Sequence, residues 1–448
     1  MAIGIRFIAE SYDTNSGKKI KSRVLRADEI KRPTTLKEFG YLHKEQIKLI
    51  EDIQNFKLYY ETKLINEDTI ICPNCGKKAV LRGTRKSNFH AALTDHKINI
   101  QRHSCTCGWS VPDTVDSIYG SSLHPDLVEK QLIQGSNNSY RQASRNLNSE
   151  SANNRSINND DRIRRNIYDV AKIIEEEKLK GLDQSKESEA AQQLIVVVDG
   201  GHLKSTNSNS RSFEAMISTV YGPKNIRRID KGHNEITKKT SVGSALSDQQ
   251  QTIKKLTQNA CYKEGSNSNV TELTCLTDGA SNCWSITNSL ADCCKSLTNI
   301  LDWFHVAKKF TMINNHVDFE FEKKLEKVKW FLWHGKPKDA LERLNQLKNN
   351  IEGDKLLSEL SDLQDYILRN EKYIVNYSKR KLANLPFTST YAESSVNAII
   401  NARQKDNKKM QWSREGAHSV LQIRTSKFSN TWEQDWSKAQ EKIYLKAA

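Results

Sequence analysis

The sequence contains no apolar run of the length that spans a lipid bilayer, and its first residues do not follow the plan of a signal peptide. We therefore expect a cytoplasmic protein that has no membrane partner. Its nine cysteines do not indicate a disulfide framework, because cytoplasmic thiols stay reduced. Five are scattered along the chain and are expected to be small core residues: Cys261, Cys275, Cys283, Cys293 and Cys294.

Acidic residues are in deficit. The 69 lysines and arginines outnumber the 54 aspartates and glutamates, so the formal net charge is +15. This surplus favours an acidic polymer as partner, although a solvated basic face would have the same composition. The apolar content of 37% is typical of a globular protein. A chain of 448 residues is long enough for two to four domains.

The stretch 193–202 predicts the central strand of the protein. Five consecutive apolar residues, four of them β-branched, end at Asp199 and two glycines. Such a run indicates a strand buried on both faces, with Asp199 at the carboxyl end where open α/β sheets place their chemistry. Two later apolar runs end at Asp278 and Asp302. A single Asp-Gly is usually a turn, but carboxylates gathered at one sheet edge repel unless a cation lies between them.

Four cysteines form two close pairs, each followed by a glycine, in Cys72-Pro-Asn-Cys75-Gly and Cys105-Thr-Cys107-Gly. The C-x2-C spacing lets two thiolates hold one ion, and the alternating stretches between the pairs predict short strands. We therefore predict a structural zinc site in a β-ribbon over residues 71–120, rather than unrelated reduced cysteines. Three nearby histidines are alternative ligands that we do not expect to be used: His90, His96 and His103.

Helical spacing dominates the flanks of this module. In the region 1–70, apolar residues recur at helical spacing from Leu36 to Leu64, which predicts helices that pack on the next module or on a second copy of the chain. The region 121–180 predicts three helices joined by short turns, of which the first ends at Gly135 and the second has Ser139 as its N-cap. This pattern is typical of a helix-turn-helix DNA-binding domain and also of any small three-helix bundle. Its candidate DNA-binding residues are Arg141, Arg145, Arg155, Arg162, Arg164 and Arg165.

The second half of the chain alternates strands and helices. After a polar linker at 181–192, three sequential strands precede alternating helices and strands, which is the order of the ribonuclease H fold. The second and third of these strands are expected at 212–221 and 235–242. Residues 306–386 are charged and helical and predict an all-α insertion. We therefore expect a multidomain α+β protein, with a ribonuclease H-like α/β catalytic domain formed by residues 193–305 and 387–448.

Several motifs together resemble DDE transposases of bacterial insertion sequences. They are Asp199-Gly, Thr277-Asp278-Gly, Asp302-Trp-Phe-His305 and Tyr391-Ala-Glu393-Ser-Ser-Val-Asn397. The greatest similarity is to the Mutator-like branch, which has a helical insertion between the second acid and the glutamate. The tail 409–424 is also similar, so the resemblance covers about residues 193–430. It implies that Asp199, Asp278 and Glu393 are the three catalytic acids.

The resemblance also implies a mechanism. Two Mg²⁺ or Mn²⁺ ions about 3.5–4 Å apart would clamp the scissile phosphate, with Asp199 bridging both ions. Related families have a C-x-x-H step at which this chain has Asp302 and His305. Asp302 is therefore either a metal ligand or, with His305, the hydrogen-bonding corner before the insertion.

Other residues of the motifs allow two interpretations each. His202 and Lys204 either contact DNA or belong to an ordinary hairpin, and Asn397 either touches substrate or makes a local hydrogen bond. The resemblance implies cleavage and transfer of DNA strands at terminal inverted repeats, by a homodimer or larger assembly that binds double-stranded DNA in the nucleoid. The alternatives are a DNA-binding regulator derived from a transposase and a ribonuclease H-like nuclease without strand transfer.

Overall fold

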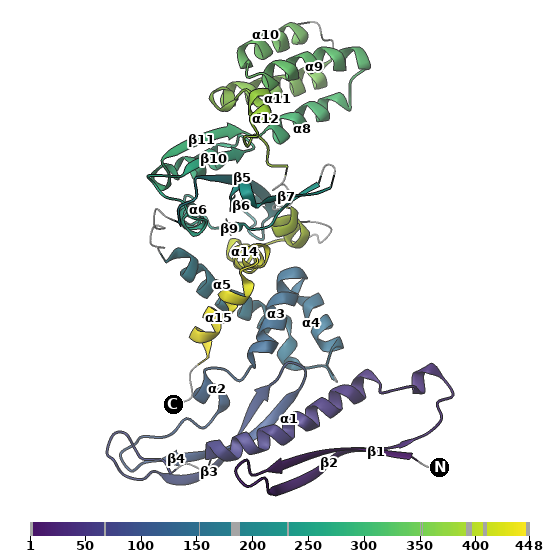
Figure 1. The fold of residues 1–448 in the computed structure, drawn as a ribbon, viewed down its shortest axis with the longest axis vertical. Helices are drawn as coiled ribbons and strands as arrows, with labels where there is room; N and C mark the ends of the chain where they lie inside the picture. Colours follow the sequence, from purple (N-terminus) through teal and green to yellow (C-terminus); the bar gives the residue numbers. More distant parts are fainter. Residues whose placement is uncertain are drawn as a thin grey trace. The chain divides into compact units, whose positions relative to one another are not determined.

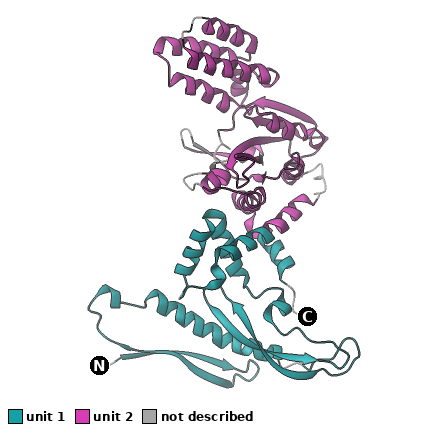
Figure 2. Cartoon of the chain, turned by 180° about the vertical axis from the view of Figure 1, so that it is seen from behind, with its two compact units in different colours: residues 1–170, 436–448 teal, residues 171–435 magenta. Residues whose placement is uncertain are grey.

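The structure is a computed structural model that describes residues 3–66, 69–151, 153–180, 189–230, 233–349, 351, 353–390, 397–405 and 410–444. These residues form a mixed α+β protein of two compact units (Figure 2): residues 1–170 with 436–448 form unit 1, and residues 171–435 form unit 2. The boundary falls inside helix α5, Asp160–Leu179, ahead of the predicted linker. In the described ranges no helix is both long and apolar enough to cross a membrane.

Unit 1 begins with an antiparallel ribbon of β1, Ile3–Tyr12, and β2, Lys19–Ile30. The short η1, Leu36–Glu38, and helix α1, His43–Asn66, follow. The helical spacing from Leu36 to Leu64 thus correctly predicts α1, whereas the sequence before it indicates no more than one short strand and does not predict the ribbon. A bulge between Phe7 and Ile8 shifts the pairing register and interrupts the alternation of apolar and polar residues that would signal a strand.

The middle of unit 1 is a β-hairpin followed by one short helix and three longer ones. Strands β3, Val80–His90, and β4, Asp95–Ser104, pair antiparallel. After the short α2, Val115–Tyr119, come α3, Pro125–Asn137, α4, Tyr140–Ser149, and α5. The predicted N-cap of α4 is present, since the Ser139 side chain accepts a hydrogen bond from the backbone N–H of Gln142. The sequence places the end of α3 at Gly135, but the helix continues to Asn137.

Gly135 has a packing role rather than a terminating one. A Cβ atom there would lie 2.6 Å from Cγ2 of Ile163 and 2.7 Å from Cδ1 of Ile167, both on α5. Glycine therefore allows α3 and α5 to approach closely. This close approach fixes the packing of the three helices around buried Leu127 and Leu132.

Unit 2 is built on a five-stranded sheet with the order β11-β10-β5-β6-β9. The strands are β5, Gln193–Lys204, β6, Ser212–Tyr221, β9, Thr240–Ser244, β10, Glu272–Thr277, and β11, Ser296–Leu301. Strands β5, β6 and β9 are antiparallel, whereas β10 and β11 run parallel to β5. This order agrees with three sequential strands followed by an alternation of helix and strand.

One predicted strand divides into two. The stretch from Glu235 to Val242 was expected to form the third strand of the sheet. Glu235 and Ile236 instead belong to a separate ribbon of β7, Ile226–Asp230, and β8, His233–Ile236, and the sheet strand begins only at Thr240. Polar residues Lys238 and Lys239 separate the two pieces and interrupt the apolar pattern.

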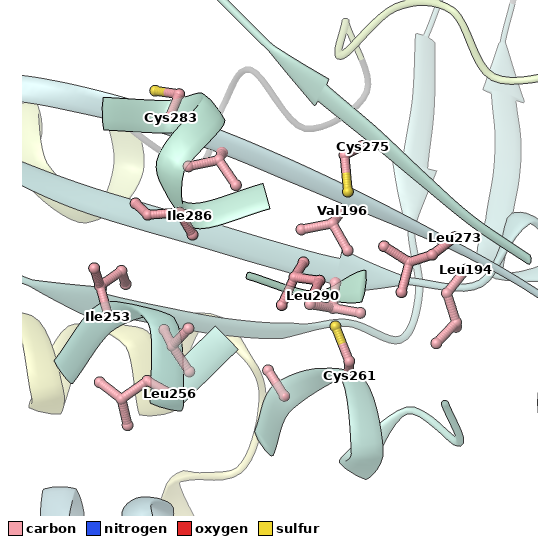
Figure 3. Packing of buried hydrophobic residues seen from close by; sticks show 14 of the residues in the cluster. Leu194, Val196, Ile253, Leu256, Cys261, Leu273, Cys275, Cys283, Ile286 and Leu290 are labelled. Atoms are coloured by element: carbon pink, nitrogen blue, oxygen red, sulfur yellow. The ribbon is translucent and has the colours of Figure 1, made fainter. Parts of the chain in front are cut away.

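Strand β5 is covered on both faces, as its apolar run predicts. Leu194, Val196 and Val198 pack with helices α6, Gln251–Lys263, and α7, Ser281–Asn288, while Ile195 and Val197 belong to a second cluster. Figure 3 shows Val196 and Leu194 among the first group, close to Cys275. The five scattered cysteines are all buried and unpaired by disulfides, so their interpretation as core residues is confirmed.

Helices follow β11 along the chain (Figure 1). The described residues from 303 to 382 form α8, Trp303–Asn314, α9, Phe319–Trp333, α10, Pro337–Lys348, α11, Asp354–Asn370, and α12, Tyr377–Leu382. Most of them share an apolar core of their own, centred on residues such as Phe310 and Leu344. The chain then continues through the π-helix η7, Asn397–Lys405, to α14, Arg414–Phe428, and α15, Trp432–Ile443.

Candidate functional site

Three aspartates occupy equivalent positions on three adjacent parallel strands. Thr277 of β10 pairs with Val198 of β5 and with Leu301 of β11. The next residue on each strand is an acid, so Asp278 lies beside Asp199 on one side and Asp302 on the other. The backbone N–H of Asp302 donates to the carbonyl of Thr277 at 2.9 Å, which continues the row. The sequence prediction that these acids share one edge of the sheet agrees with this register.

Burial and mutual repulsion act on this row. Burial raises the pKa of Asp199, and the negative charges of Asp278 and Asp302 raise it further. His305 and the backbone N–H of Gly200 oppose these effects, and that N–H donates to Oδ1 of Asp199 at 2.7 Å. Burial likewise raises the pKa of Asp302, which is only 1% exposed. The edge therefore holds buried negative charge that a cation would stabilise.

Asp278 is held by its own loop and by the helical region. Its Oδ1 accepts a hydrogen bond from the backbone N–H of Ala280 at 2.9 Å, and its carbonyl accepts one from the Tyr366 hydroxyl at 2.9 Å. Gly279, at φ +93°, makes the turn between Asp278 and Ala280. Helix α11 thus fixes the backbone that carries the second acid.

Asp302 is engaged by protein donors. It is the N-cap of α8, where Oδ1 accepts from the backbone N–H of Phe304 at 3.1 Å. The same oxygen accepts from the backbone N–H of Ser389 at 2.9 Å, and Oδ2 accepts from the Ser389 hydroxyl. Nε2 of His305 lies 3.7 Å from Oδ2. These contacts are those of a corner fixed by hydrogen bonds, which was one of the two interpretations of Asp302 and His305.

Glu393 lies outside the described residues, as do its neighbours from 391 to 396, and so does the side chain of Asn397. The chain on either side of them is anchored at the sheet. Ser389 is bonded to Asp302, and the backbone N–H of Trp303 donates to the carbonyl of Phe387 at 3.2 Å. On the other side, Ile400 of η7 packs directly on Gly201 of β5. The contact is so close that a Cβ atom added to Gly201 would lie 3.1 Å from Cδ1 and Cγ2 of Ile400.

Trp412 and Arg424 hold η7 in place. Trp412 is buried, its indole N–H donates to the carbonyl of Gln404 at 3.2 Å, and its backbone N–H donates to the carbonyl of Lys204 at 2.9 Å. Nε of Arg424 donates to the carbonyl of Ile399 at 2.7 Å. Both side chains therefore stabilise the fold around the site, whereas the Lys204 side chain is exposed.

Glu214 is an acid of this region that the sequence analysis missed. It lies on β6 directly opposite His202, and its carboxylate occupies the space that a Cβ atom on Gly200 would need. Burial raises the pKa of Glu214, the charges of Asp278 and Asp199 raise it further, and His202 lowers it. Its Oε2 accepts a hydrogen bond from Asn282 of α7. Only the register between β5 and β6 places Glu214 here, and no local sequence signal contains that information.

The four paired cysteines lie together, as predicted, in a cluster that could hold a metal ion. Their Sγ atoms all lie within 4.8 Å of one another. Tetrahedral zinc with Zn–S bonds of about 2.3 Å needs sulfurs about 3.8 Å apart, so only small shifts are required. The glycine after each pair takes a positive φ, +69° at Gly76 and +93° at Gly108, which turns the chain back around the thiols. A hydrogen bond from the backbone N–H of Cys107 and, to a smaller extent, one from the Cys75 thiol lower the pKa of Cys105 to about 6.

Two of the three nearby histidines are engaged elsewhere. His96 is buried and contacts Oδ1 of Asn55 at 2.7 Å, and His90 contacts Oδ1 of Asp95 at 2.7 Å. Among the described residues, the four cysteines are the only group of three or more candidate ligands that meets the 4.8 Å spacing. The aspartates of the sheet edge, taken without Glu393, are not gathered to that distance.

The arginines of the three-helix region differ in exposure. Arg141 and Arg145, four residues apart on α4, are exposed on one face, and Arg165 is exposed on α5. Arg164 is exposed and forms an ion pair with Asp161 at 2.9 Å. Arg162 is half-buried.

Arg155 does not belong with this surface. It is 6% exposed and donates to the carbonyls of Ala91, Ala92 and Thr94 and to Oδ1 of Asp95. The sequence grouped it with the candidate DNA-binding residues, but this guanidinium instead joins the segment before α5 to the β3–β4 hairpin. Because the hydrogen-bond partners of Arg155 are distant in the sequence, the local sequence does not show that this arginine is buried.

Comparison with known proteins adds no identification. No protein-family model matches the sequence, and no curated protein matches it either. The functional argument therefore rests on the geometry of the sheet edge and of the cysteine cluster.

Proposed function

We propose that this chain is a DDE-type DNA transposase that binds the terminal inverted repeats of its element and catalyses metal-dependent cleavage and transfer of DNA strands. The observation that carries the proposal is the row of Asp199, Asp278 and Asp302 at one register of three parallel strands. The strand order of unit 2 supports a ribonuclease H-like domain, in which an acid of the central strand and an acid of its parallel neighbour face the same edge.

The anchored flanks of residues 391–396 support Glu393 as the third acid. Glu393 is four residues from Ser389, which is bonded to Asp302, and seven residues from Ile400, which packs on Gly201. Four residues of extended chain reach about 14 Å at most. The described chain before position 393 is thus bonded to Asp302, and the described chain after it packs on the strand that carries Asp199, which supports the proposal that Glu393 joins these acids.

Asp199, Asp278 and Glu393 would hold two Mg²⁺ or Mn²⁺ ions, which when bound supply an activated water and stabilise the leaving oxygen. The pKa of Asp199 is raised by burial and by the negative charges of Asp278 and Asp302, and carboxylates that repel one another in this way form a donor set that suits such ions. Asp302 acts as a positioning residue, since its oxygens accept hydrogen bonds from the segment that leads to Glu393. Tyr366 positions the backbone of Asp278 in the same way.

Unit 1 would supply recognition of duplex DNA. We assign the four-cysteine hairpin as a structural zinc ribbon and α3 to α5 as a helix-turn-helix, with Arg141 and Arg145 facing phosphates from one side of α4. Lys204, exposed at the end of β5, would also contact DNA. Neutralised phosphates release counterions, so binding should weaken steeply with salt. Two DNA ends must be joined, which favours a homodimer or larger assembly.

The test is a strand-transfer assay with the DNA that flanks the gene, the purified protein and Mg²⁺. Asp199→Asn, Asp278→Asn and Glu393→Gln should abolish cleavage and joining while DNA binding persists. Asp362→Asn, which removes an exposed acid of α11, is the matched control and should remain active. Joining by Asp199→Asn would contradict the assignment. Cleavage without joining would favour a nuclease, and binding alone would favour a regulator.

A further inference from the structure

A cleft of about 710 Å³ lies in unit 1 between β2, α1 and β4. It is separate from the acids of unit 2 and from the exposed arginines of α4. Buried Leu58 and Thr62 of α1 are among its lining residues, together with half-buried Phe56. Lys21 and Arg23 of β2 contribute one wall, and residues 97–101 of β4 contribute the other.

The wall formed by β4 is fixed to the helix by polar side chains. Nδ2 of Asn66, the last residue of α1, donates to the carbonyl of Asn99 at 2.9 Å, and its Oδ1 accepts from the backbone N–H of Gln101 at 2.9 Å. At the other end, Asn55 contacts the ring of buried His96 at 2.7 Å. The ribbon is joined to α1 by the hydrogen bond from the Ser11 hydroxyl to Tyr60, at 2.6 Å. The cleft is therefore a built feature of the fold.

The lining of the cleft is basic, and the residues that line it include no carboxylate. Its four cations come from all three elements: Lys21, Arg23, Lys63 and Lys97. Among the described residues, no ion pair involves Lys21, Arg23 or Lys97. Lys21, Arg23 and Lys97 bring like charges into one cleft, and an anion between them would offset their mutual repulsion.

An aromatic ring lies among these charges. Tyr59 is 56% exposed, and the ammonium of Lys21 lies 5.2 Å from its ring centroid. A positive groove with an exposed aromatic ring is the combination that binds single-stranded nucleic acid, because the cations track the backbone while a base stacks on the ring. The amide side chains of Asn99 and Gln101, which also line the cleft, can hydrogen-bond base edges.

We propose that this cleft binds a short stretch of single-stranded nucleic acid, with its phosphates on Lys21, Arg23 and Lys97 and one base stacked on Tyr59. The volume suits a ligand of drug-like size, about one or two nucleotides. A duplex would lie across the mouth and leave the ring and the amides unused. This binding needs neither the acids nor the three-helix region, so it goes beyond the proposed transposase activity.

The test measures binding of a fluorescent oligo(dT) to the zinc-loaded full chain without Mg²⁺, by anisotropy, in the presence of excess unlabelled duplex. The variant Lys21→Gln/Lys97→Gln should bind about tenfold more weakly. Its salt dependence should be shallower by about 1.4 in log–log slope, because two phosphate contacts are lost. Tyr59→Leu should weaken binding by roughly five- to hundredfold. The control Lys37→Gln/Lys44→Gln removes two exposed lysines outside the cleft and should bind as the wild type.

Equal affinities for the cleft and control variants would overturn the proposal, as would complete displacement of the oligonucleotide by millimolar pyrophosphate, which would indicate a small-anion subsite. Photo-crosslinking with 5-iodouracil oligonucleotides gives a second readout on the unmodified protein. The crosslink should map to the peptide that contains Tyr59, and a crosslink confined to α4 or α5 would contradict the site. Strand transfer depends on Asp199 and Asp278, so the failure of either proposal is recognised separately.

Discussion

Replacing Gly201 by alanine tests whether η7, which follows position 393, is packed on the central strand. Gly201 lies in β5 opposite Ala215 and has no positive φ, so alanine suits its backbone. The added methyl would lie 3.1 Å from Cδ1 and Cγ2 of Ile400, whereas carbon atoms prefer about 3.5–4.0 Å. Ile400 must therefore move by a few tenths of an ångström or more. Overpacking of this kind costs about 1–3 kcal/mol.

The displacement should also reduce activity. A shift of about 1 Å in a catalytic group can lower the rate roughly a hundredfold, so a smaller shift of η7 should lower strand transfer about tenfold without removing any acid. Urea unfolding and the strand-transfer assay measure the two effects. Gly222→Ala is the control, because its new methyl would meet Asn225 at an ordinary 3.5 Å and should change stability by less than about 0.5 kcal/mol.

A double-mutant cycle isolates the contact. Ile400→Ala removes both Cδ1 and Cγ2 and leaves Cβ, 3.7 Å from the new methyl. In that background Gly201→Ala should cost about 1 kcal/mol less than in the wild type. If Gly201→Ala changes neither stability nor activity, η7 does not pack on β5 as described, and the argument that places Glu393 near Asp199 loses its support.

Three further predictions concern the rest of the chain. Cys72→Ser should lower the zinc content from one ion per chain, measured by atomic absorption, and speed hydrogen exchange in β3 and β4; unchanged zinc would contradict the cluster. Arg155→Met should destabilise unit 1 by about 3 kcal/mol, because it leaves buried carbonyls and the charge of Asp95 unpaired. The control Arg165→Met changes an exposed residue and should alter the stability by less than about 0.5 kcal/mol. If hydrogen exchange shows that both variants destabilise unit 1 equally, Arg155 does not join the hairpin to the helices. Folding raises the pKa of Asp302 above 3.8, the usual value for an aspartate. Between pH 3.8 and the raised pKa, the folded protein therefore binds more protons than the unfolded chain. The free energy of unfolding consequently falls as the pH rises through this window. Asp302→Asn should flatten the pH dependence of the melting temperature there, and an unchanged profile would refute the shift.

The sequence predicts the sheet edge well because its signals are local. An apolar run that ends at an acid identifies Asp278 and Asp302 as strand-end residues, and parallel strands then bring their ends together. Asp199 has the same signal, but β5 continues past it to Lys204, because residues 199–204 pair with β6. The four cysteines are predictable for the same reason, since ligand spacing and turn glycines are short-range features.

The residues that sequence analysis misplaced depend on long-range contacts. Glu214 joins the acidic region only through the register of β6 on β5, and Arg155 is buried by partners about sixty residues away in the chain. Gly135 resembles a helix terminator until the packing of α3 on α5 is known. Pairing and packing of this kind are decided by tertiary structure, which overrides local pattern.

The central claim is that distant carboxylates converge to bind divalent cations, and crystals of the protein soaked in Mn²⁺ test it most directly. Anomalous scattering should reveal manganese about 2.0–2.2 Å from carboxylate oxygens of Asp199, Asp278 and Glu393. Absence of manganese at this sheet edge in a well-ordered crystal, or a Glu393 side chain directed away from an ion held by the two aspartates, would contradict the account.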